Sequence, residues 1–281
     1  MQQTETPPKG AKAPVGSVVS LLRYPIKSMI GEELTTSHVT ELGLLGDRTR
    51  ALVDQTTGRV VSAKNPRKWG RLFDFRASFA DPPTPGDPLP DIRISLPDGR
   101  VVMADQLGTD DVLSEALGAQ VRLMTAPLEE PSLEEYWPDV EGLANREKVT
   151  EEVMPARTFF DAASVHVLTT ATTDRLQELY PEGRFEARRF RPNLVVETAQ
   201  DVKGFVENDW VGRTLRVGEQ VRLKVSRPCG RCVMTTLAQG DLPQDLGILR
   251  TVARHNNVRV GVYASVERGG HIQRADPVWL E

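Results

Sequence analysis

Short apolar runs of about strand length dominate the chain. Runs of four to eight apolar or alternating residues, bounded by glycine, proline or polar residues, are typical of β-strands. In the first half they predict strands at 17–23, 72–79 and 121–124 and hairpins at 49–63 and 92–104, the latter turning at Asp98-Gly99. The proline-rich run DPPTPGDPLP at 81–90 cannot pair in a sheet, so it predicts an exposed loop.

The second half repeats this pattern and adds most of the helical periodicity. Strands are expected at 165–168, 194–197, 214–217, 220–225, 258–266 and 278–280. Helices are expected at 110–117, capped by Thr109 and ended by Gly118, at 170–179, with cap candidates in 169–173, and at 247–254. Many short strands and few helices predict a mainly β (α+β) protein with two β-barrel-like domains.

Composition changes between the two halves and at the N-terminus. Residues 127–157 are rich in Glu, Pro and Asp, and predict a connection between domains with one helical turn near Tyr136 and Trp137. A merely solvated acidic face explains this segment equally well. Residues 1–15 have neither the apolar core of a signal peptide nor an arginine-rich transit pattern, so we expect a disordered tail.

Overall composition narrows the class of protein. With 281 residues, 39% hydrophobic and 26% charged, the chain has an ordinary globular composition that excludes collagen, coiled coil and wholesale disorder. A net charge of −4 argues against nucleic-acid binding, and no apolar run is long enough to span a membrane. Two cysteines, Cys229 and Cys232, are too few for a disulfide scaffold and favour a reducing, cytoplasmic location.

The two cysteines form a Cys-Gly-Arg-Cys run at 229–232. A zinc site would need two further ligands, but no other cysteine exists and the four histidines are isolated in the sequence. A thioredoxin-like pair would start a helix after a strand, whereas this run follows a predicted hairpin strand. A single thiolate that binds a soft metal within a cofactor is a third possibility, and two thiols without a role is the fourth. Arg231 would lower the pKa of a neighbouring thiol, or it could clamp an anion.

Three further segments carry candidate anion-binding groups. The run RFEARRFRPN at 184–193 holds four arginines before a strand, and strand alternation would place Arg189 and Arg191 on one face, with Asn193 in a turn fixed by proline. Lys27 and Ser28 lie in a turn without the glycines of a P-loop, and Arg48 follows Gly46-Asp47. A small anionic ligand fits these groups better than nucleic acid does.

Together, YPIKS, GLLGDR, RFRPN and CGRC followed by two threonines occur in the order that is typical of one family. From about Ser17 to the C-terminus the sequence resembles the MOSC proteins, named for the C-terminal domain of molybdenum cofactor sulfurase. It resembles the two-part members, which include the mitochondrial amidoxime-reducing component and bacterial relatives. The resemblance implies an N-terminal β-barrel domain at 16–126 and a MOSC domain at 158–281.

The resemblance also implies a site. In the family the second cysteine of the Cys-x-Arg-Cys run ligates molybdenum, which here is Cys232, the catalytic and metal-binding residue; Cys229 would have a structural role. The implied cofactor-binding residues are Lys27, Ser28, Arg48, Thr169, Thr170, Thr172, Arg189, Arg191, Asn193 and Arg231. The threonines would add phosphate donors at a helix N-terminus, where serine and threonine also serve as ordinary caps.

The implied activity is the reduction of N-hydroxylated compounds such as amidoximes and hydroxylamines by a molybdenum cofactor. Electrons would come from a separate ferredoxin, flavin or cytochrome-type reductase, because the chain has no cysteines left for an iron–sulfur cluster. A cofactor carrier or sulfur-handling module is the alternative function, and a fold that has lost its cofactor is the third. Family membership also carries an expectation of pyridoxal phosphate binding, although the pyridoxal phosphate domain of a complete sulfurase is missing.

Overall fold

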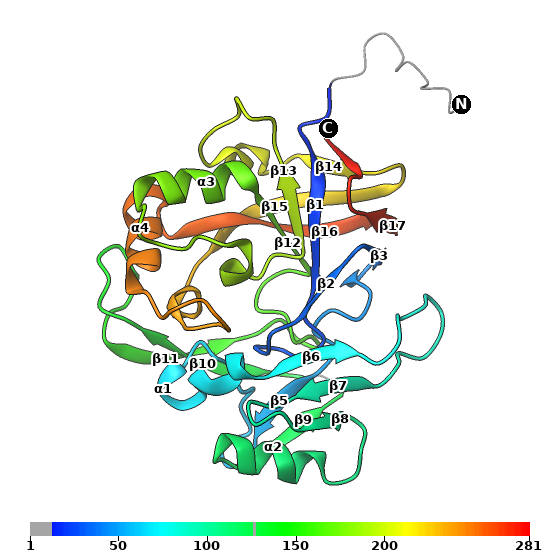
Figure 1. Ribbon diagram of the computed structural model, residues 1–281, viewed down its shortest axis with the longest axis vertical. Helices are drawn as coiled ribbons and strands as arrows, with labels where there is room; N and C mark the ends of the chain where they lie inside the picture. Colours follow the sequence, from blue (N-terminus) through cyan, green and yellow to red (C-terminus); the bar gives the residue numbers. More distant parts are fainter. Residues whose placement is uncertain (1–12, 126–127) are drawn as a thin grey trace.

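Seven strands close into a β-barrel at one end of the molecule (Figure 1). A computed structural model describes residues 13–125 and 128–281. Around the barrel the strand order is β13-β12-β16-β15-β14-β18-β1, closed by pairing of β1 with β13. These strands are β1 (Gly16–Arg23), β12 (Val165–Thr169), β13 (Leu194–Glu197), β14 (Thr214–Val217), β15 (Val221–Gly230), β16 (Arg259–Arg268) and β18 (Pro277–Leu280).

The barrel is filled by β-branched and leucine side chains, among them Val18, Leu21, Val167 and Leu223. Such residues pack well on a pleated surface, which explains why these short runs form strands. Two helices, α3 (Thr170–Leu179) and α4 (Leu246–Asn256), cover one side through a second apolar cluster that includes Leu176 and Val252. Every residue of β12 is buried, because it lies between this cluster and the barrel interior.

Strand β1 lies in the segment that we expected to belong to the first domain, yet it is a strand of the barrel. It pairs with β13 through Leu21 and Leu194, and Val15 already donates its N–H to the Val278 carbonyl at 2.7 Å. The last residue of the expected tail is therefore paired, while residues 1–12 lie outside the described part of the chain. Strand β2 (Glu32–Leu34) pairs antiparallel with the end of β1, and β17 (Gly270–Gln273), β3 (Thr36–Thr40) and β4 (Gly43–Leu44) form a neighbouring sheet.

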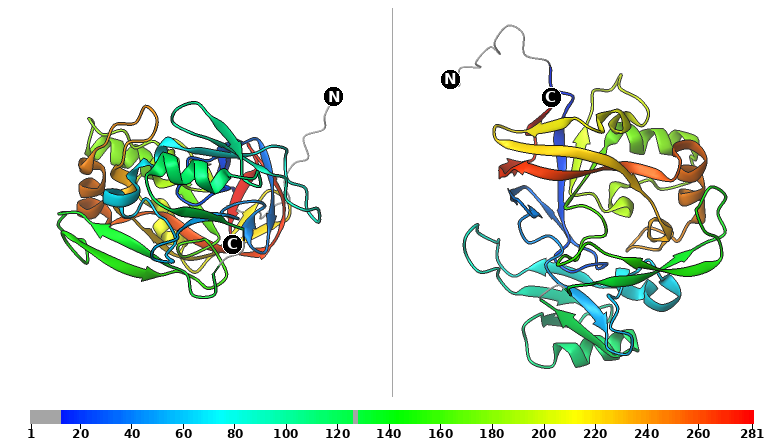
Figure 2. Two further views of the ribbon diagram at one scale, coloured as in Figure 1. Left: turned by 90° about the horizontal axis from the view of Figure 1, so that it is seen from below. Right: turned by 180° about the vertical axis from the view of Figure 1, so that it is seen from behind.

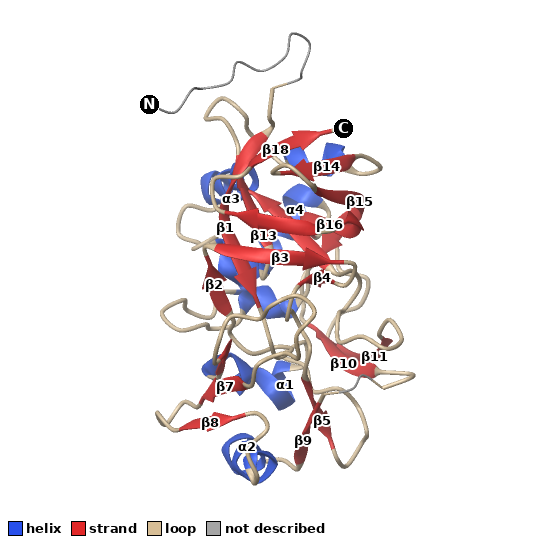
Figure 3. Ribbon diagram, turned by 90° about the vertical axis from the view of Figure 1, so that its right-hand side faces the viewer, coloured by secondary structure: helices blue, strands red, loops and turns tan. Residues whose placement is uncertain are grey.

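The other end of the molecule is a smaller unit with its own core (Figure 3). Its sheets are β5 (Ala51–Asp54) with β9 (Val121–Met124), and β6 (Arg76–Phe79) with β7 (Ile92–Ser95) and β8 (Val101–Met103). Its helices are α1 (Pro66–Trp69), a 3₁₀ segment (Gly70–Asp74) and α2 (Thr109–Leu117). The expected strand at 72–79 is thus only half a strand, and Gly108, not Thr109, is the N-cap of α2.

The acidic connection forms a β-hairpin of β10 (Ser132–Trp137) and β11 (Lys148–Val153), so the expected helical turn near Tyr136 and Trp137 is wrong. Seen from behind, this green hairpin lies between the barrel strands and the α2 end (Figure 2). The Tyr136 N–H donates to the Lys64 carbonyl and the Val60 N–H to the Ser132 carbonyl, each at 2.8 Å. The hairpin is therefore fixed along the 60–64 segment.

The prediction of a mainly β fold in two parts is confirmed. The strands at 121–124, 194–197 and 214–217 have the expected bounds, and 81–90 is irregular as expected. Among the described residues, no helix is long and apolar enough to cross a membrane.

Candidate functional site

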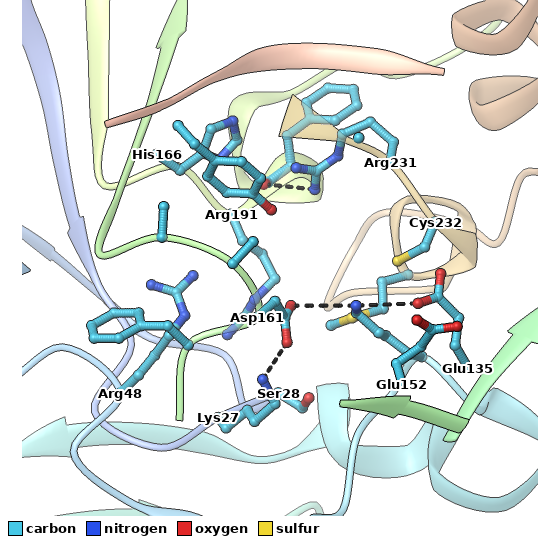
Figure 4. Close-up of a pocket in the computed structure, with 18 of the residues that line it drawn as sticks. Lys27, Ser28, Arg48, Glu135, Glu152, Asp161, His166, Arg191, Arg231 and Cys232 are labelled. Atoms are coloured by element: carbon cyan, nitrogen blue, oxygen red, sulfur yellow. Dashed lines mark hydrogen bonds and ion pairs between the residues drawn. The ribbon is translucent and has the colours of Figure 1, made fainter. Parts of the chain in front are cut away.

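A pocket of about 450 Å³ lies where the barrel, the smaller unit and the β10–β11 hairpin meet (Figure 4). Its lining includes six cationic and three anionic side chains: Lys27, Arg48, Lys64, Arg191, Arg227, Arg231, Glu135, Glu152 and Asp161. Ser28, His166, Asn193 and Cys232 also line it. Segments far apart in the sequence therefore build one strongly polar cavity.

Lys27 and Ser28 reach the pocket because the chain turns sharply after β1. The Lys27 N–H donates to the Arg50 carbonyl at 2.9 Å, and Ser28 takes a left-handed φ of 64°. The Lys27 Nζ donates to the Phe159 carbonyl at 3.0 Å and to Oδ1 of Asp161. Oδ2 of Asp161 lies 3.8 Å from the Lys64 Nζ, so this carboxylate sits between two ammonium groups.

This arrangement sets the charges around Asp161. Burial lowers the pKa of Lys27 to about 8, against the opposing effect of Asp161. Burial by itself would raise the pKa of Asp161, but Lys27 and Lys64 outweigh it and hold that pKa well below its usual range. Burial would likewise lower the pKa of Lys64, but Asp161 and Glu135 hold it above its usual range. Asp161 is therefore ionised and Lys64 is charged at neutral pH.

Arg48 enters the pocket from a turn that is tied to the barrel. Gly46 has a φ of 85°, and a Cβ there would lie 2.5 Å from the Phe79 ring, so glycine is required. The Asp47 carboxylate accepts hydrogen bonds from the Tyr24 N–H at 2.7 Å and from Asn193 Nδ2 at 3.0 Å, and it pairs with Arg48. Asp47 and Asn193 thus join the two halves of the chain at the pocket.

Arg191 supplies a buried donor without a protein partner. Its Nη1 donates to the Met29 carbonyl at 2.8 Å, and its guanidinium lies 4.1 Å from the centre of the Tyr24 ring. Among the described residues no partner is found for its buried Nη2, and burial lowers the pKa of Arg191 to about 10. Because buried polar groups are almost always hydrogen-bonded, this nitrogen indicates a place for a ligand acceptor.

Cys232 comes to the pocket because the residues after it pack into the smaller unit. The 3₁₀ segment Val233–Thr236 follows it, and Val233, Met234 and Leu237 belong to the apolar core of that unit. The Cys232 side chain is half-buried, and burial together with Glu135 raises its pKa to about 11. It is therefore a protonated thiol when nothing ligates it.

Arg231 acts on the other cysteine. Its Nη1 lies 2.7 Å from Sγ of Cys229, and its Nη2 donates to the Phe190 carbonyl at 2.9 Å. Burial would raise the pKa of Cys229, but Arg231 and His166 outweigh it and lower that pKa to about 6. Cys229 is fully buried and does not line the pocket.

The structure does not bring four of the expected cofactor residues into the pocket lining. Arg189 is fully buried, and it donates to the carbonyls of Arg184, Leu237 and Pro243 at 2.7, 3.2 and 2.8 Å. The expected alternation of Arg189 with Arg191 is wrong, because Ala187–Phe190 is a 3₁₀ turn and not a strand.

The threonines are also occupied elsewhere. Thr169 caps α3 by accepting from the Thr172 N–H, and both hydroxyls donate to Oε2 of the buried Glu207, at 2.6 and 2.7 Å. The Thr170 hydroxyl accepts from the Thr198 N–H at 3.2 Å. These contacts are those of a helix cap and its support.

Sequence reasoning missed Lys64, Glu135, Trp137, Glu152 and Asp161 as pocket residues. None of them lies in a motif, and three are on the hairpin that we expected to be an irregular connection. The alternation of Glu135 with Trp137 on a strand is the one signal that could have shown that both face the same side.

The structure defines a mainly β protein with a closed barrel and a pocket in which six cationic side chains lie around a single half-buried thiol. Residues 155–279 match the MOSC domain, and residues 15–78 match the MOSC N-terminal beta barrel domain. The chain therefore belongs to the MOSC family.

Named relatives extend over nearly the whole chain. Mitochondrial amidoxime reducing component 2 of Rattus norvegicus is 24% identical over 297 aligned residues, covering 94% of this chain and 83% of that protein. Mitochondrial amidoxime-reducing component 1 of Xenopus laevis is 26% identical, covering 94% and 82%. The solved YUAD protein from Bacillus subtilis aligns over 94% of this chain and 93% of its own, with a TM-score of 0.44 and 11% identity.

Proposed function

We propose that this protein binds a molybdenum cofactor in the pocket and reduces N-hydroxylated compounds such as amidoximes and hydroxylamines, with Cys232 as the metal ligand. The observation that carries the proposal is the convergence of one half-buried thiol with a cradle of buried cations in one cavity. The relatives named as amidoxime-reducing components support the same reaction class.

The residues present fit such a group. A thiolate is a soft ligand suited to molybdenum, and binding a metal would remove the proton that Cys232 holds in its absence. Nη2 of Arg191 and Nε of Arg231 are buried and have no hydrogen-bond partner within the described part of the chain, and an anionic, oxygen-rich cofactor would satisfy these donors. Lys27, Ser28, Arg48 and Asn193 supply the remaining polar contacts in our proposal.

The cofactor, when bound, would supply the two-electron chemistry of the reduction. The chain's own residues position it and set the charge of the cavity. Asp161 fixes the Lys27 and Lys64 ammonium groups, so both cations keep their places when no ligand is present. Asp47 pairs with Arg48 and accepts a hydrogen bond from Asn193, whereas Arg191 is held by its hydrogen bond to the Met29 carbonyl.

Electrons would come from a separate protein, a ferredoxin or a flavin- or cytochrome-type reductase. The two cysteines of the sequence both lie at or beside the pocket, so none remains for an iron–sulfur cluster.

The test is expression in a host that makes molybdenum cofactor, followed by measurement of bound molybdenum and pterin. We expect molybdenum and pterin each in about equimolar amount to the protein. We also expect reduction of benzamidoxime to benzamidine with reduced methyl viologen as electron donor. Protein without molybdenum and pterin would refute the proposal. Bound cofactor without turnover of any N-hydroxylated compound would favour the carrier or sulfur-handling alternative.

A further inference from the structure

The β10–β11 hairpin gives the pocket an acidic and aromatic wall. Glu135, Trp137 and Glu152 line the pocket from this hairpin. In the close-up, Glu135 and Glu152 lie beside Cys232, while Lys27 and Arg48 lie on the other side of Asp161 (Figure 4). Glu135, Glu152 and Cys232 therefore lie on one side of Asp161, where the Lys64 ammonium pairs with Glu135 and lies 3.8 Å from Asp161.

The three carboxylates of the pocket differ in their partners. Asp161 pairs with Lys27 and Lys64, and Glu135 pairs with Lys64 at 3.2 Å. Glu152 makes no ion pair with any residue in 13–125 or 128–281. Glu152 thus borders the cavity without a direct ion-pair partner among these residues.

Glu152 and Trp137 are held in place by one shared side chain. The Trp137 Nε1–H donates to Oγ1 of Thr150 at 2.7 Å, and that hydroxyl donates to Oε1 of Glu152 at 2.8 Å. Trp137 and Thr150 are on adjacent strands of a paired hairpin, so the chain of hydrogen bonds fixes the indole and the carboxylate relative to each other. The second carboxylate oxygen of Glu152 has no hydrogen-bond partner among the described residues.

A fixed indole next to an unpaired carboxylate is suited to a cation. Aromatic rings attract cations through the negative charge of their faces, and tryptophan does so most strongly. The carboxylate adds direct charge attraction, which is stronger in a partly enclosed site than in open water. Arg227, a lining cation on β15, has its guanidinium 5.7 Å from the centre of the Tyr263 ring and makes no ion pair with Glu152.

We propose that Trp137 and Glu152 form a cation-recognising wall that makes the pocket prefer N-hydroxylated substrates with a positively charged group near the N–OH centre. This inference rests on the proposed function and names its substrate class. Lys27, Arg48 and Arg191 would hold the anionic part of the cofactor, and Trp137 and Glu152 would hold the cationic group of the substrate near Cys232.

The test uses two benzamidoximes of the same shape that differ in charge, with a 4-trimethylammonio or a 4-tert-butyl group. For the cofactor-loaded protein with a chemical electron donor, we expect kcat/KM about tenfold higher for the charged compound. Glu152→Gln keeps the shape and the Thr150 hydrogen bond, and we expect it to reduce this preference at least about fivefold. Trp137→Leu should reduce it as well.

Glu151→Gln is the matched control. Glu151 is the neighbouring residue on the opposite face of β11, where its carboxylate pairs with Arg59 at 2.6 Å, so its loss should leave the preference unchanged. An equal preference in wild type and Glu152→Gln would overturn the inference, and so would an equal loss in Glu151→Gln.

A binding measurement separates failure of the inference from failure of the proposed function. Isothermal titration of the cofactor-loaded protein with phenyltrimethylammonium should show binding that weakens about fivefold or more in Glu152→Gln and not in Glu151→Gln. If neither benzamidoxime is reduced, the proposed reaction fails, while this titration still decides on the cation-recognising wall. Absence of any binding, or equal affinity in wild type and Glu152→Gln, would contradict the proposal that Trp137 and Glu152 recognise a cation.

Discussion

Nη1 of Arg231 lies 2.7 Å from Sγ of Cys229, the cysteine that is turned away from the pocket. Arg231 therefore stabilises a buried thiolate at Cys229 and does little for Cys232, whose pKa is raised to about 11 by burial and by Glu135. This corrects the expectation that the arginine of the Cys-Gly-Arg-Cys run activates the metal-binding thiol. The two cysteines differ in ionisation because one has a guanidinium partner and the other has a carboxylate neighbour.

The Cys229 thiolate predicts a pH-dependent contribution to stability. The pKa of Cys229 is about 6 in the folded protein, below its ordinary value of 9.0, because Arg231 and His166 outweigh burial. The folded state then holds fewer protons at this site between pH 6 and 9, so its stabilising effect is complete above pH 9 and is lost as the pH falls through 6. Urea unfolding of the cofactor-free protein should show that the advantage of wild type over Cys229→Ser grows from pH 6 to 9.

Cys232→Ser is the control for that experiment. The pKa of Cys232 is raised, so its thiol stays neutral in the folded protein and its ionisation cannot produce a pH dependence between 6 and 8. A constant difference between wild type and Cys229→Ser across the whole range would show that Cys229 is not a thiolate.

Cys232→Ala should abolish reduction of N-hydroxylated compounds and reduce bound molybdenum, because it removes the proposed metal ligand. Its stability should fall by only about 1 kcal/mol, since the side chain is half-buried. Molybdenum content by mass spectrometry and the midpoint of urea unfolding check both parts. Unchanged turnover in this variant would refute the assigned ligand.

Substitution of Arg189 should mainly lower the free energy of unfolding, whereas substitution of Arg191 should mainly weaken cofactor binding. Arg189→Met removes donors to the carbonyls of Arg184, Leu237 and Pro243, so we expect a loss of about 3 kcal/mol or more in the free energy of unfolding. Arg191→Met removes one protein hydrogen bond, to Met29, so its cost should be nearer 1–2 kcal/mol, with a larger loss of bound molybdenum. Greater loss of molybdenum from Arg189→Met at equal folded fraction would contradict this assignment.

Thr172→Val should leave cofactor binding unchanged. The hydroxyl of Thr172 donates to Glu207, which is buried, so its removal should cost about 1–3 kcal/mol of stability. Chemical unfolding and the molybdenum content of the folded fraction measure these two effects. A reduced molybdenum content in that fraction would show that Thr172 contributes to cofactor binding.

Local pattern was sufficient for short strands that are bounded by turn residues, even where the partner strand is far away in the sequence. Leu194–Glu197 and Thr214–Val217 could be predicted because short apolar runs between turn residues have few other stable conformations. The segment at 72–79 could not, because its apolar residues pack into the core from a 3₁₀ turn as well as they would from a strand. The hairpin β10–β11 was missed because it is fixed by hydrogen bonds to residues 60–64, which lie about 70 residues earlier in the chain.

By itself, the sequence determined the mainly β class and the family resemblance, and it singled out the two cysteines and several arginine- and lysine-bearing motifs as candidate site residues. Only the tertiary structure decided that Arg191 and not Arg189 lines the pocket, and that Cys229 and not Cys232 has the guanidinium partner. It also showed that Lys64, Glu135, Glu152 and Asp161 complete the cavity lining. The reason is physical: propensity and apolar pattern act over a few residues, whereas burial and pairing of charges depend on contacts that form only when the barrel closes through β1 and β13.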